Sequence, residues 1–138
     1  MVFQDILKIT RHGKGVYEIT DLITDIIKES KIAVGTCQIF SQSSTSSILI
    51  GDTVHESTKK GTADFLAHFA PNDESAIDAI NEGMKNIPDN LKNIIHRTSL
   101  SIPISNSKPG IGVWQGIYLW QQSESKKSRK ITVTIMGE

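Results

Sequence analysis

Hydroxyl side chains are concentrated in the stretch SQSSTSS, residues 41–47, where six of seven residues are serine or threonine. The stretch lies between IAVGTCQIF and ILIGD, two apolar segments that are typical of strands. Hydroxyl groups and backbone amides of a small polar loop can form a concave site for an anion such as phosphate. A solvated turn has the same composition, and the phosphate-loop pattern GxxxxGK[ST] is absent from the sequence. Composition alone leaves both interpretations open.

A serine in this stretch would need a neighbouring base to act as a nucleophile. The sequence contains four histidines, none of them in a triad signature: His12, His55, His68 and His96. The motif GxSxG is also absent, which disfavours a Ser–His–Asp enzyme. Because the zinc patterns HExxH and CxxC are absent too, the residues alone predict no zinc site.

Charged residues form two further candidate groups. One is a set of carboxylates that could bind a hard cation, although on a helix such residues more often face solvent: Asp52, Glu56 and Asp64. The other is a set of cations at a predicted hairpin tip that could contact phosphates: Lys126, Lys127, Arg129 and Lys130. No aromatic side chain lies between these cations, and the fifteen basic residues are balanced by fifteen acidic ones. Nucleic-acid binding is therefore disfavoured.

The stretch IGVWQGIYLW, residues 111–120, holds both tryptophans of the chain. On a strand, its side chains would divide between two faces, with Trp114, Gly116, Tyr118 and Trp120 on one and Val113, Gln115, Ile117 and Leu119 on the other. Bulky side chains on both faces predict that both are covered. Gln115 lies among apolar neighbours, and a buried amide must find partners. We therefore expect Gln115 to be bonded within the fold or to face a site or a subunit interface.

Hydrophobic spacing predicts the elements that must position these residues. Alternation favours strands over residues 2–10, 16–20, 32–40, 48–52, 100–104, 111–120 and 131–138, with hairpins at RHGKG (11–15) and QQSESKKSRK (121–130). Residues 20–31 predict a helix with Thr20 as N-cap and an apolar stripe of Leu22, Ile23, Ile26 and Ile27. Further helices are predicted over residues 53–70, 73–87 and 89–97. This order predicts an α+β domain with a largely antiparallel sheet and about three helices packed on it.

Length and composition restrict the number of domains and the general class of the protein. The 138 residues suit one domain, residues 1–138, and 38% hydrophobic residues suffice for a folded core. The single cysteine, Cys37, excludes an intrachain disulfide and favours a cytoplasmic location. Asp5 and Lys8 interrupt the first apolar stretch, which is therefore no signal peptide, and no apolar run is long enough to span a membrane.

Several stretches together resemble one known family over nearly the whole chain: VYEITDLITDIIKES, GTCQIFSQSSTSSILIGD, DFLAHFAP, LSIPI, GIGVWQGIYL and SRKITVTIMGE. This is the YjbQ-like family, also called the secondary thiamine-phosphate synthase family. The resemblance implies a sheet curled into a half-barrel and assembly as a homotrimer. It also implies a pocket near subunit contacts where histidines hold a metal ion. Weak thiamine-phosphate synthase activity is associated with the family.

The sequence departs from the family pattern at those histidines. One family histidine aligns with Ser43, another with Asn90, and the Asn–Glu pair that follows the first aligns with Gly51 and Asp52. A further histidine has no counterpart. Serine and asparagine neither carry protons near neutral pH nor serve as ordinary zinc ligands. The comparison therefore implies a dismantled metal site, and a divalent metal cofactor is implied by the resemblance alone.

These observations predict a homotrimeric binding protein for a small molecule or a phosphate-containing ligand, with a degenerate metal or catalytic site. The predicted ligand-binding residues are Ser43, Ser44, Thr45, Ser47, Asn90 and Gln115, and the candidate catalytic residues are Ser43, Asn90 and Asp52. Two alternatives stay open: a weakly active transferase of the thiamine-phosphate synthase type, and a non-catalytic structural subunit. Whether the chain is an enzyme is left open, because the family histidines are replaced.

Overall fold

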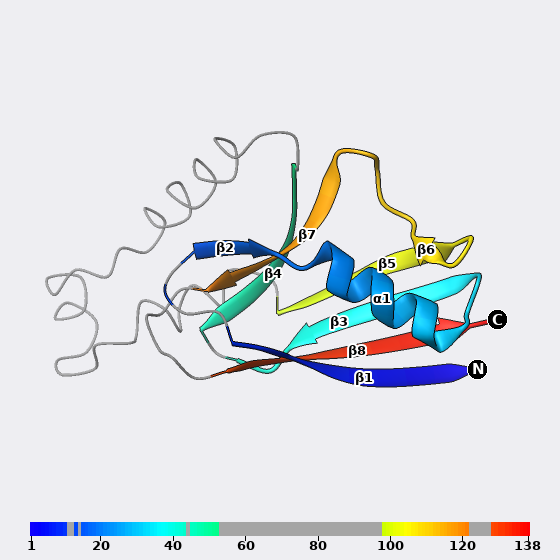
Figure 1. Cartoon of the computed structure of the whole chain (residues 1–138), viewed down its shortest axis with the longest axis horizontal. Helices are drawn as coiled ribbons and strands as arrows, with labels where there is room; N and C mark the ends of the chain where they lie inside the picture. The colour runs from blue at the N-terminus through cyan, green and yellow to red at the C-terminus, as the bar shows by residue number, and fades with distance from the viewer. Residues whose placement is uncertain (11–12, 14, 44, 53–97, 122–127) are drawn as a thin grey trace, which may run out of the picture.

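The computed structural model describes residues 1–10, 13, 15–43, 45–52, 98–121 and 128–138. Their elements are β1 (Val2–Ile9), β2 (Gly15–Glu18), α1 (Thr20–Ser30), β3 (Gly35–Ser41), β4 (Ser46–Asp52), β5 (Ser99–Ser105), β6 (Lys108–Pro109), β7 (Gln115–Gln121) and β8 (Arg129–Gly137). A five-stranded sheet has the order β1-β8-β3-β5-β6, and a three-stranded sheet has the order β2-β7-β4. Neighbouring strands are antiparallel throughout, and the sheets curl into a half-barrel (Figure 1).

The α+β class and the antiparallel half-barrel are thus confirmed. The expected count of about three helices is not supported, because the part of the chain that the structure describes contains α1 alone. The helices predicted over residues 53–70, 73–87 and 89–97 lie outside the described residues. With 11 residues, α1, the helix of the described part, is too short to cross a membrane.

Both predicted hairpins are wrong. β1 pairs along its whole length with β8, from Val2 opposite Met136 to Ile9 opposite Arg129, whereas β2 pairs with β7. β7 and β8 likewise lie in different sheets. The eight residue pairs between β1 and β8 give a longer ladder than the four-residue β2 could offer to either strand. The number of residue pairs, and not closeness in the sequence, therefore decides which strands pair.

The ends of six strands meet at one end of the half-barrel, which we call the junction end. In the larger sheet, β8 begins at Arg129 where β1 ends, and β3 ends two residues further along β8. In the smaller sheet, Gln121 at the end of β7 pairs with Ser46 at the start of β4 and with Gly15 at the start of β2. The strand ends that the β1–β2, β3–β4 and β7–β8 connections join therefore all lie at this end, toward the left of Figure 1.

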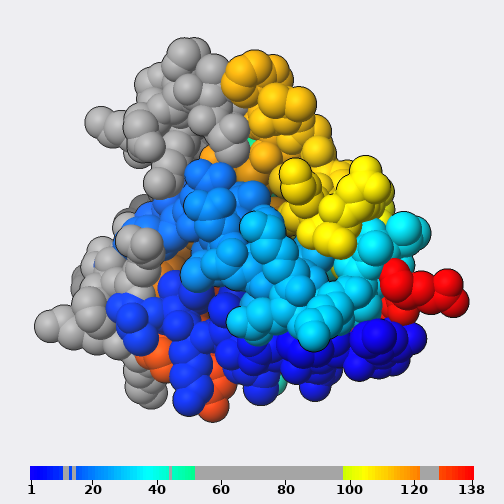
Figure 2. Space-filling model, turned by 45° about the vertical axis from the view of Figure 1, so that its right-hand side comes forward, coloured from blue at the N-terminus to red at the C-terminus, as the bar shows by residue number. Residues whose placement is uncertain are grey.

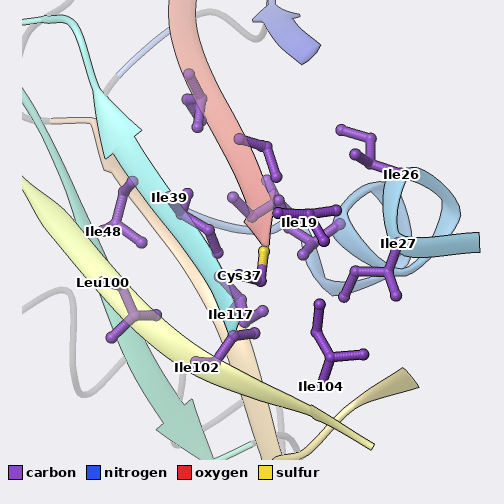
Figure 3. Packing of buried hydrophobic residues seen from close by; sticks show 14 of the residues in the cluster. Ile19, Ile26, Ile27, Cys37, Ile39, Ile48, Leu100, Ile102, Ile104 and Ile117 are labelled. Carbon is purple, nitrogen blue, oxygen red and sulfur yellow. The ribbon is translucent and has the colours of Figure 1, made fainter. Parts of the chain in front are cut away.

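The apolar core lies between the sheets and α1, and isoleucine dominates it (Figure 3). From α1 it receives Ile23, Ile26 and Ile27, as the helical spacing predicts, but Leu22 is 41% exposed and does not belong to the buried stripe. On the surface, α1 lies between β1 and the β5–β6 hairpin (Figure 2). One face of the helix therefore seals the half-barrel, and the other meets solvent.

Thr20 is the first residue of α1 rather than its N-cap. Ile19 holds the N-cap position, and no side chain caps the helix. The Thr20 hydroxyl instead accepts a hydrogen bond from the backbone N–H of Ile117 at 2.8 Å and donates one to Glu18 Oε2 at 2.9 Å. The residue thus ties the start of the helix to β7.

Strand β7 is covered on both faces, as its sequence predicts. Ile117 and Leu119 belong to the main core, whereas Tyr118 and Trp120 form a second buried cluster with Val16. The strand is shorter than predicted, because Val113 and Trp114 precede it in a turn and are 86% and 65% exposed.

Candidate functional site

The hydroxyl-rich stretch forms the β3–β4 connection at the junction end. Ser43 Oγ and Thr45 Oγ1 lie 3.2 Å apart, and the Thr45 N–H donates a hydrogen bond to Ser43 Oγ at 3.2 Å. The Ser43 N–H donates to Ser41 Oγ at 3.4 Å. The turn therefore gathers its hydroxyl groups. Ser44 lies outside the described residues.

The next two serines of the stretch are fully buried on opposite faces of β4. Ser46 continues the inward row of Ile48 and Ile50, both of which pack into the main core. Ser47 pairs with Trp120 and lies on the other face. Of the two, only Ser46 thus faces the interior of the half-barrel.

Arg129 is buried at the junction end, with 4% of its surface exposed. Its Nε donates a hydrogen bond to Ser46 Oγ at 3.0 Å. The sequence places Arg129 among the cations of a solvated hairpin tip, and the structure corrects this: it opens the inward row that continues through Ile131 and Val133, whereas its neighbour Lys130 is exposed. Arginine is almost never fully buried unless it is paired, so a buried arginine marks a position with a specific role.

Gln121 is the polar residue next to this pair. It continues the inward row of Ile117 and Leu119, it pairs directly with Ser46, and only 1% of its surface is exposed. Among the residues that the structure describes, its side-chain Nε2 and Oε1 are the buried side-chain atoms without a hydrogen-bond partner. A buried polar group without a partner is unfavourable and calls for an explanation.

Four inward rows thus end in a polar residue at the junction end: Ser41 on β3, Ser46 on β4, Gln121 on β7 and Arg129 on β8. Sequence reasoning missed the last three as a group. The sequence did contain a signal for them: each residue lies two positions beyond the last apolar residue of an alternating strand, and therefore on the same face of that strand. The junction end is therefore the polar end of an otherwise apolar interior.

Gln115 and Asp52 lie at the opposite end of the smaller sheet, where they pair with each other. Six residue steps along β4 lead from Ser46 to Asp52, which corresponds to roughly 20 Å along a strand. Gln115 is exposed, and its Oε1 accepts a hydrogen bond from the Gly112 N–H at 2.7 Å. Within one chain, the structure therefore brings Ser43 and Thr45 together but not with Gln115 or Asp52. Asn90 lies outside the described residues, and the ligand-binding roles of all these positions stay predictions.

The described residues contain no group of three or more His, Cys, Asp or Glu side chains that could hold a metal ion. All four histidines lie outside that part of the chain. Cys37 is fully buried, and burial raises the pKa of its thiol to about 12. It therefore remains a neutral thiol near neutral pH and does not supply a thiolate ligand.

A family model described as UPF0047 protein YjbQ-like matches residues 5–138. The chain belongs to the YjbQ-like family. Its relatives include the UPF0047 protein sll1880 of Synechocystis, 28% identical over 98% of this chain and 92% of the relative. Another is the UPF0047 protein MJ1081 of Methanocaldococcus jannaschii, 29% identical over 100% of this chain and 96% of the relative.

Solved structures of other proteins share the fold of this chain. A YbjQ-like protein of unknown function from Sulfolobus solfataricus superposes with a TM-score of 0.87 at 24% identity, covering 100% of this chain and 99% of that one. The conserved hypothetical protein TT1486 of Thermus thermophilus gives 0.82 at 16% identity, covering 96% and 99%. At these identities the YjbQ-like neighbours show the fold alone, so a function has to be argued from the residues of this chain.

Proposed function

We propose that this YjbQ-like chain is a binding protein for a small molecule that carries a phosphate group, with a degenerate catalytic site and a homotrimeric assembly. The observation that supports ligand binding is the junction end, where the Ser43 and Thr45 hydroxyls meet in the turn that leads to the buried Arg129–Ser46 pair. Hydroxyl and guanidinium donors are the groups that proteins use to bind phosphate oxygens. Both lie on or beside strand ends, where the fold fixes their positions.

This proposal assigns no residue the role of an imidazole general acid or base. Ser43 and Asn90 stand where the family pattern has histidines, and neither side chain transfers protons near neutral pH. Binding without turnover is the function that the remaining polar groups support best. The phosphate would be held by hydrogen bonds and by the charge of a guanidinium.

Exposed apolar side chains on the outer face of the larger sheet favour self-association. Val2 and Met136 pair across β1 and β8, and Ile6 and Phe40 both lie beside Thr132. The four apolar residues are 46% to 68% exposed in the single chain. Contact between copies would remove this apolar area from water.

Calorimetric titration tests the binding proposal, with inorganic phosphate, glycerol phosphate and pyrophosphate as ligands. We expect binding of at least one compound, and a loss of about tenfold in affinity for Ser43→Ala and Thr45→Val. Ser101→Ala is the matched control, because Ser101 is an exposed hydroxyl on β5 and its removal should leave affinity unchanged. Absence of binding to all three compounds would contradict the proposal and favour a purely structural subunit.

The weak transferase is tested by a separate measurement. Incubation with a phosphorylated thiazole and a pyrimidine pyrophosphate, with and without Mg²⁺, would release pyrophosphate if the chain were an active thiamine-phosphate synthase. We expect no release above background. Light scattering tests the assembly, which should have about three times the 15.2 kDa mass of the chain. Phe40→Ser should lower this mass, whereas Gln38→Ser on the same face should not.

A further inference from the structure

Strand β1 forms one edge of the larger sheet, with β8 as its neighbour among the described strands (Figure 1). At the start of this ladder, the Met1 amino group donates a hydrogen bond to the Gly137 carbonyl at 3.0 Å, and the Gly137 N–H donates to the Met1 carbonyl at 3.1 Å. In an antiparallel pair, positions bonded in this way alternate with positions whose N–H and C=O point away from the neighbour. The even-numbered residues of β1 therefore turn their backbone groups to the free edge: Val2, Gln4, Ile6 and Lys8.

A free edge of this kind can accept a further strand. β1 has eight residues without proline or glycine, the residues that most often interrupt an edge. Val2 and Ile6 are exposed on its outer face. If the β1 strand of a second copy aligned antiparallel to it, with the two Gln4 residues opposite each other, Val2 of each copy would lie opposite Ile6 of the other. Such apolar cross-strand pairs stabilise a sheet, so the edge is complementary to itself.

Asp5 interrupts this edge. Its position belongs to the inward row of β1, between Phe3 and Leu7, which both pack against the main core. Its Oδ1 accepts a hydrogen bond from the Ile6 N–H at 2.8 Å. Of the four residues turned to the edge, Ile6 alone donates its backbone N–H within the described part of the chain. A charged residue in the inward row of an edge strand is one of the features by which proteins keep sheet edges from pairing.

We propose that Asp5 guards the free edge of β1 against the β1 strand of a second copy. The carboxylate holds the N–H of Ile6, and an incoming strand would have to displace it. Its negative charge would also repel the carbonyl oxygens of that strand. Because a hydrogen bond to a charged group is among the stronger ones, its loss should lower the equilibrium constant for pairing by about tenfold or more.

The guard separates two modes of self-association. The apolar side chains proposed to contact other copies lie on the outer face of the larger sheet, whereas Asp5 controls the edge, in the plane of that sheet. Contact between faces leaves the backbone of the edge unchanged, but pairing at the edge would continue the sheet from one copy to the next. The inference therefore goes beyond the proposed function, because it requires neither a ligand nor a particular oligomer.

Asp5→Ala removes the acceptor and should open the edge. Light scattering from micromolar to millimolar concentration should then give a mass at least twice that of the wild-type chain at the same concentration. Asp5→Asn keeps an acceptor oxygen at the same place and should associate less than Asp5→Ala. Asp25→Ala is the matched control, because it removes one carboxylate from the exposed side of α1 and should leave the mass at the wild-type value.

A second substitution shows whether the association uses the edge. Ile6→Pro removes the N–H that Asp5 holds, and proline is tolerated at a position of an edge strand whose N–H faces away from the sheet. Asp5→Ala combined with Ile6→Pro should return to the wild-type mass. Asp5→Ala combined with Ile6→Ala also loses the apolar side chain but keeps the N–H, and it should still associate.

Amide hydrogen exchange measures the guard itself in dilute protein. The Ile6 amide should exchange about tenfold or more faster in Asp5→Ala than in the wild-type chain, because it loses its acceptor. The Gln4 amide, which also faces the edge, should exchange equally in both. If Asp5→Ala does not fold, Asp5→Leu, which matches the apolar neighbours in the inward row, provides the same comparison.

Three results would overturn the proposal. One is an unchanged mass of Asp5→Ala at every concentration, which would show that the bond to Ile6 keeps no other copy away. Another is equal exchange of the Ile6 amide with and without the Asp5 carboxylate. The third is an association of Asp5→Ala that persists when Ile6→Pro is added, since it would then use a surface other than this edge.

Discussion

Arg129 Nε donates a hydrogen bond to Ser46 Oγ at 3.0 Å across 83 positions of sequence. The bond joins β8 of the larger sheet to β4 of the smaller sheet at the junction end, and both side chains are buried. Elsewhere between the described strands, the apolar core packs the two sheets together. At the junction end, a hydrogen bond to a charged group adds to that packing.

The first prediction concerns the strength of this bond. Ser46→Ala and Arg129→Met should each lower the free energy of unfolding, and the double variant should lose less than the sum of the two. The coupling should be about 1.5–3 kcal/mol, the range for a hydrogen bond to a charged group. Urea denaturation of the four proteins measures it. Lys130→Met, one residue away and exposed, is the control and should show no coupling with Ser46→Ala.

The second prediction concerns Gln115, whose side chain closes the turn before β7. Gln115→Ala removes the acceptor for the Gly112 N–H and should lower stability by about 1 kcal/mol. Gln115→Glu keeps an acceptor oxygen and should retain most of that stability. Trp114, exposed in the same turn, reports the change through its fluorescence. If both variants were equally stable, the bond would have no role in the turn.

The third prediction concerns pH and Cys37. Burial raises the pKa of its thiol from 9.0 to about 12, so the folded chain holds a proton that the unfolded chain releases at lower pH. The stabilisation is therefore complete below pH 9 and is lost as the pH rises from 9 towards 12. Urea denaturation at pH 8, 9.5 and 10.5 should show a steeper loss of stability for the wild-type chain than for Cys37→Ala.

The same burial predicts slow thiol chemistry. A disulfide reagent at pH 8 should label Cys37 only when the chain unfolds, so the labelling rate should rise with urea in parallel with the unfolded fraction. Rapid labelling without denaturant would contradict the buried position of Cys37 between the sheets (Figure 3).

The fourth prediction concerns the close approach of β3 and β8 at Gly35 and Gly137, which pair with each other. A Cβ on Gly35 would overlap the carbonyl oxygen of Met136, and neither backbone can move without breaking the ladder. Gly35→Ala should therefore lower the free energy of unfolding by about 2 kcal/mol or more. Thr36→Ala, at the next and exposed position of β3, should have a much smaller effect. Equal losses in the two variants would rule out the steric explanation.

The local elements could be read from the sequence because their periodicity is a local property. The alternation in residues 131–138 gave the inward row of β8, and the helix predicted over residues 20–31 agrees closely with α1 at Thr20–Ser30. Pairing partners could not be read in the same way. Nothing in residues 2–10 indicates that their partner lies at the other end of the chain, so nearby strands were joined into hairpins that do not exist.

The candidate site shows a second limit of prediction from the sequence. The composition of the stretch indicated Ser43 and Thr45 as candidate ligand-binding residues. Arg129 was assigned to the surface instead, because it is one of four cations at a predicted hairpin tip and such cations are usually solvated. Its burial depends on β4, which supplies Ser46 from far away in sequence. A polar residue that continues an apolar alternation by one more step can indicate a buried polar position. The indication becomes useful only when the fold shows that several such strands end at the same place.

The pairing of β1 with β8 also governs the order of events in folding. Among the described strands, β1 has no other partner, and its pairing joins residues as far apart as Val2 and Met136. During synthesis, β1 leaves the ribosome before β8 and keeps an unpaired backbone, with Val2 and Ile6 exposed, until β8 has been made. Such distant contacts make folding slow, so refolding should be limited by the capture of this strand. A nascent chain that stalls before β8 would present a free edge to chaperones and to other copies.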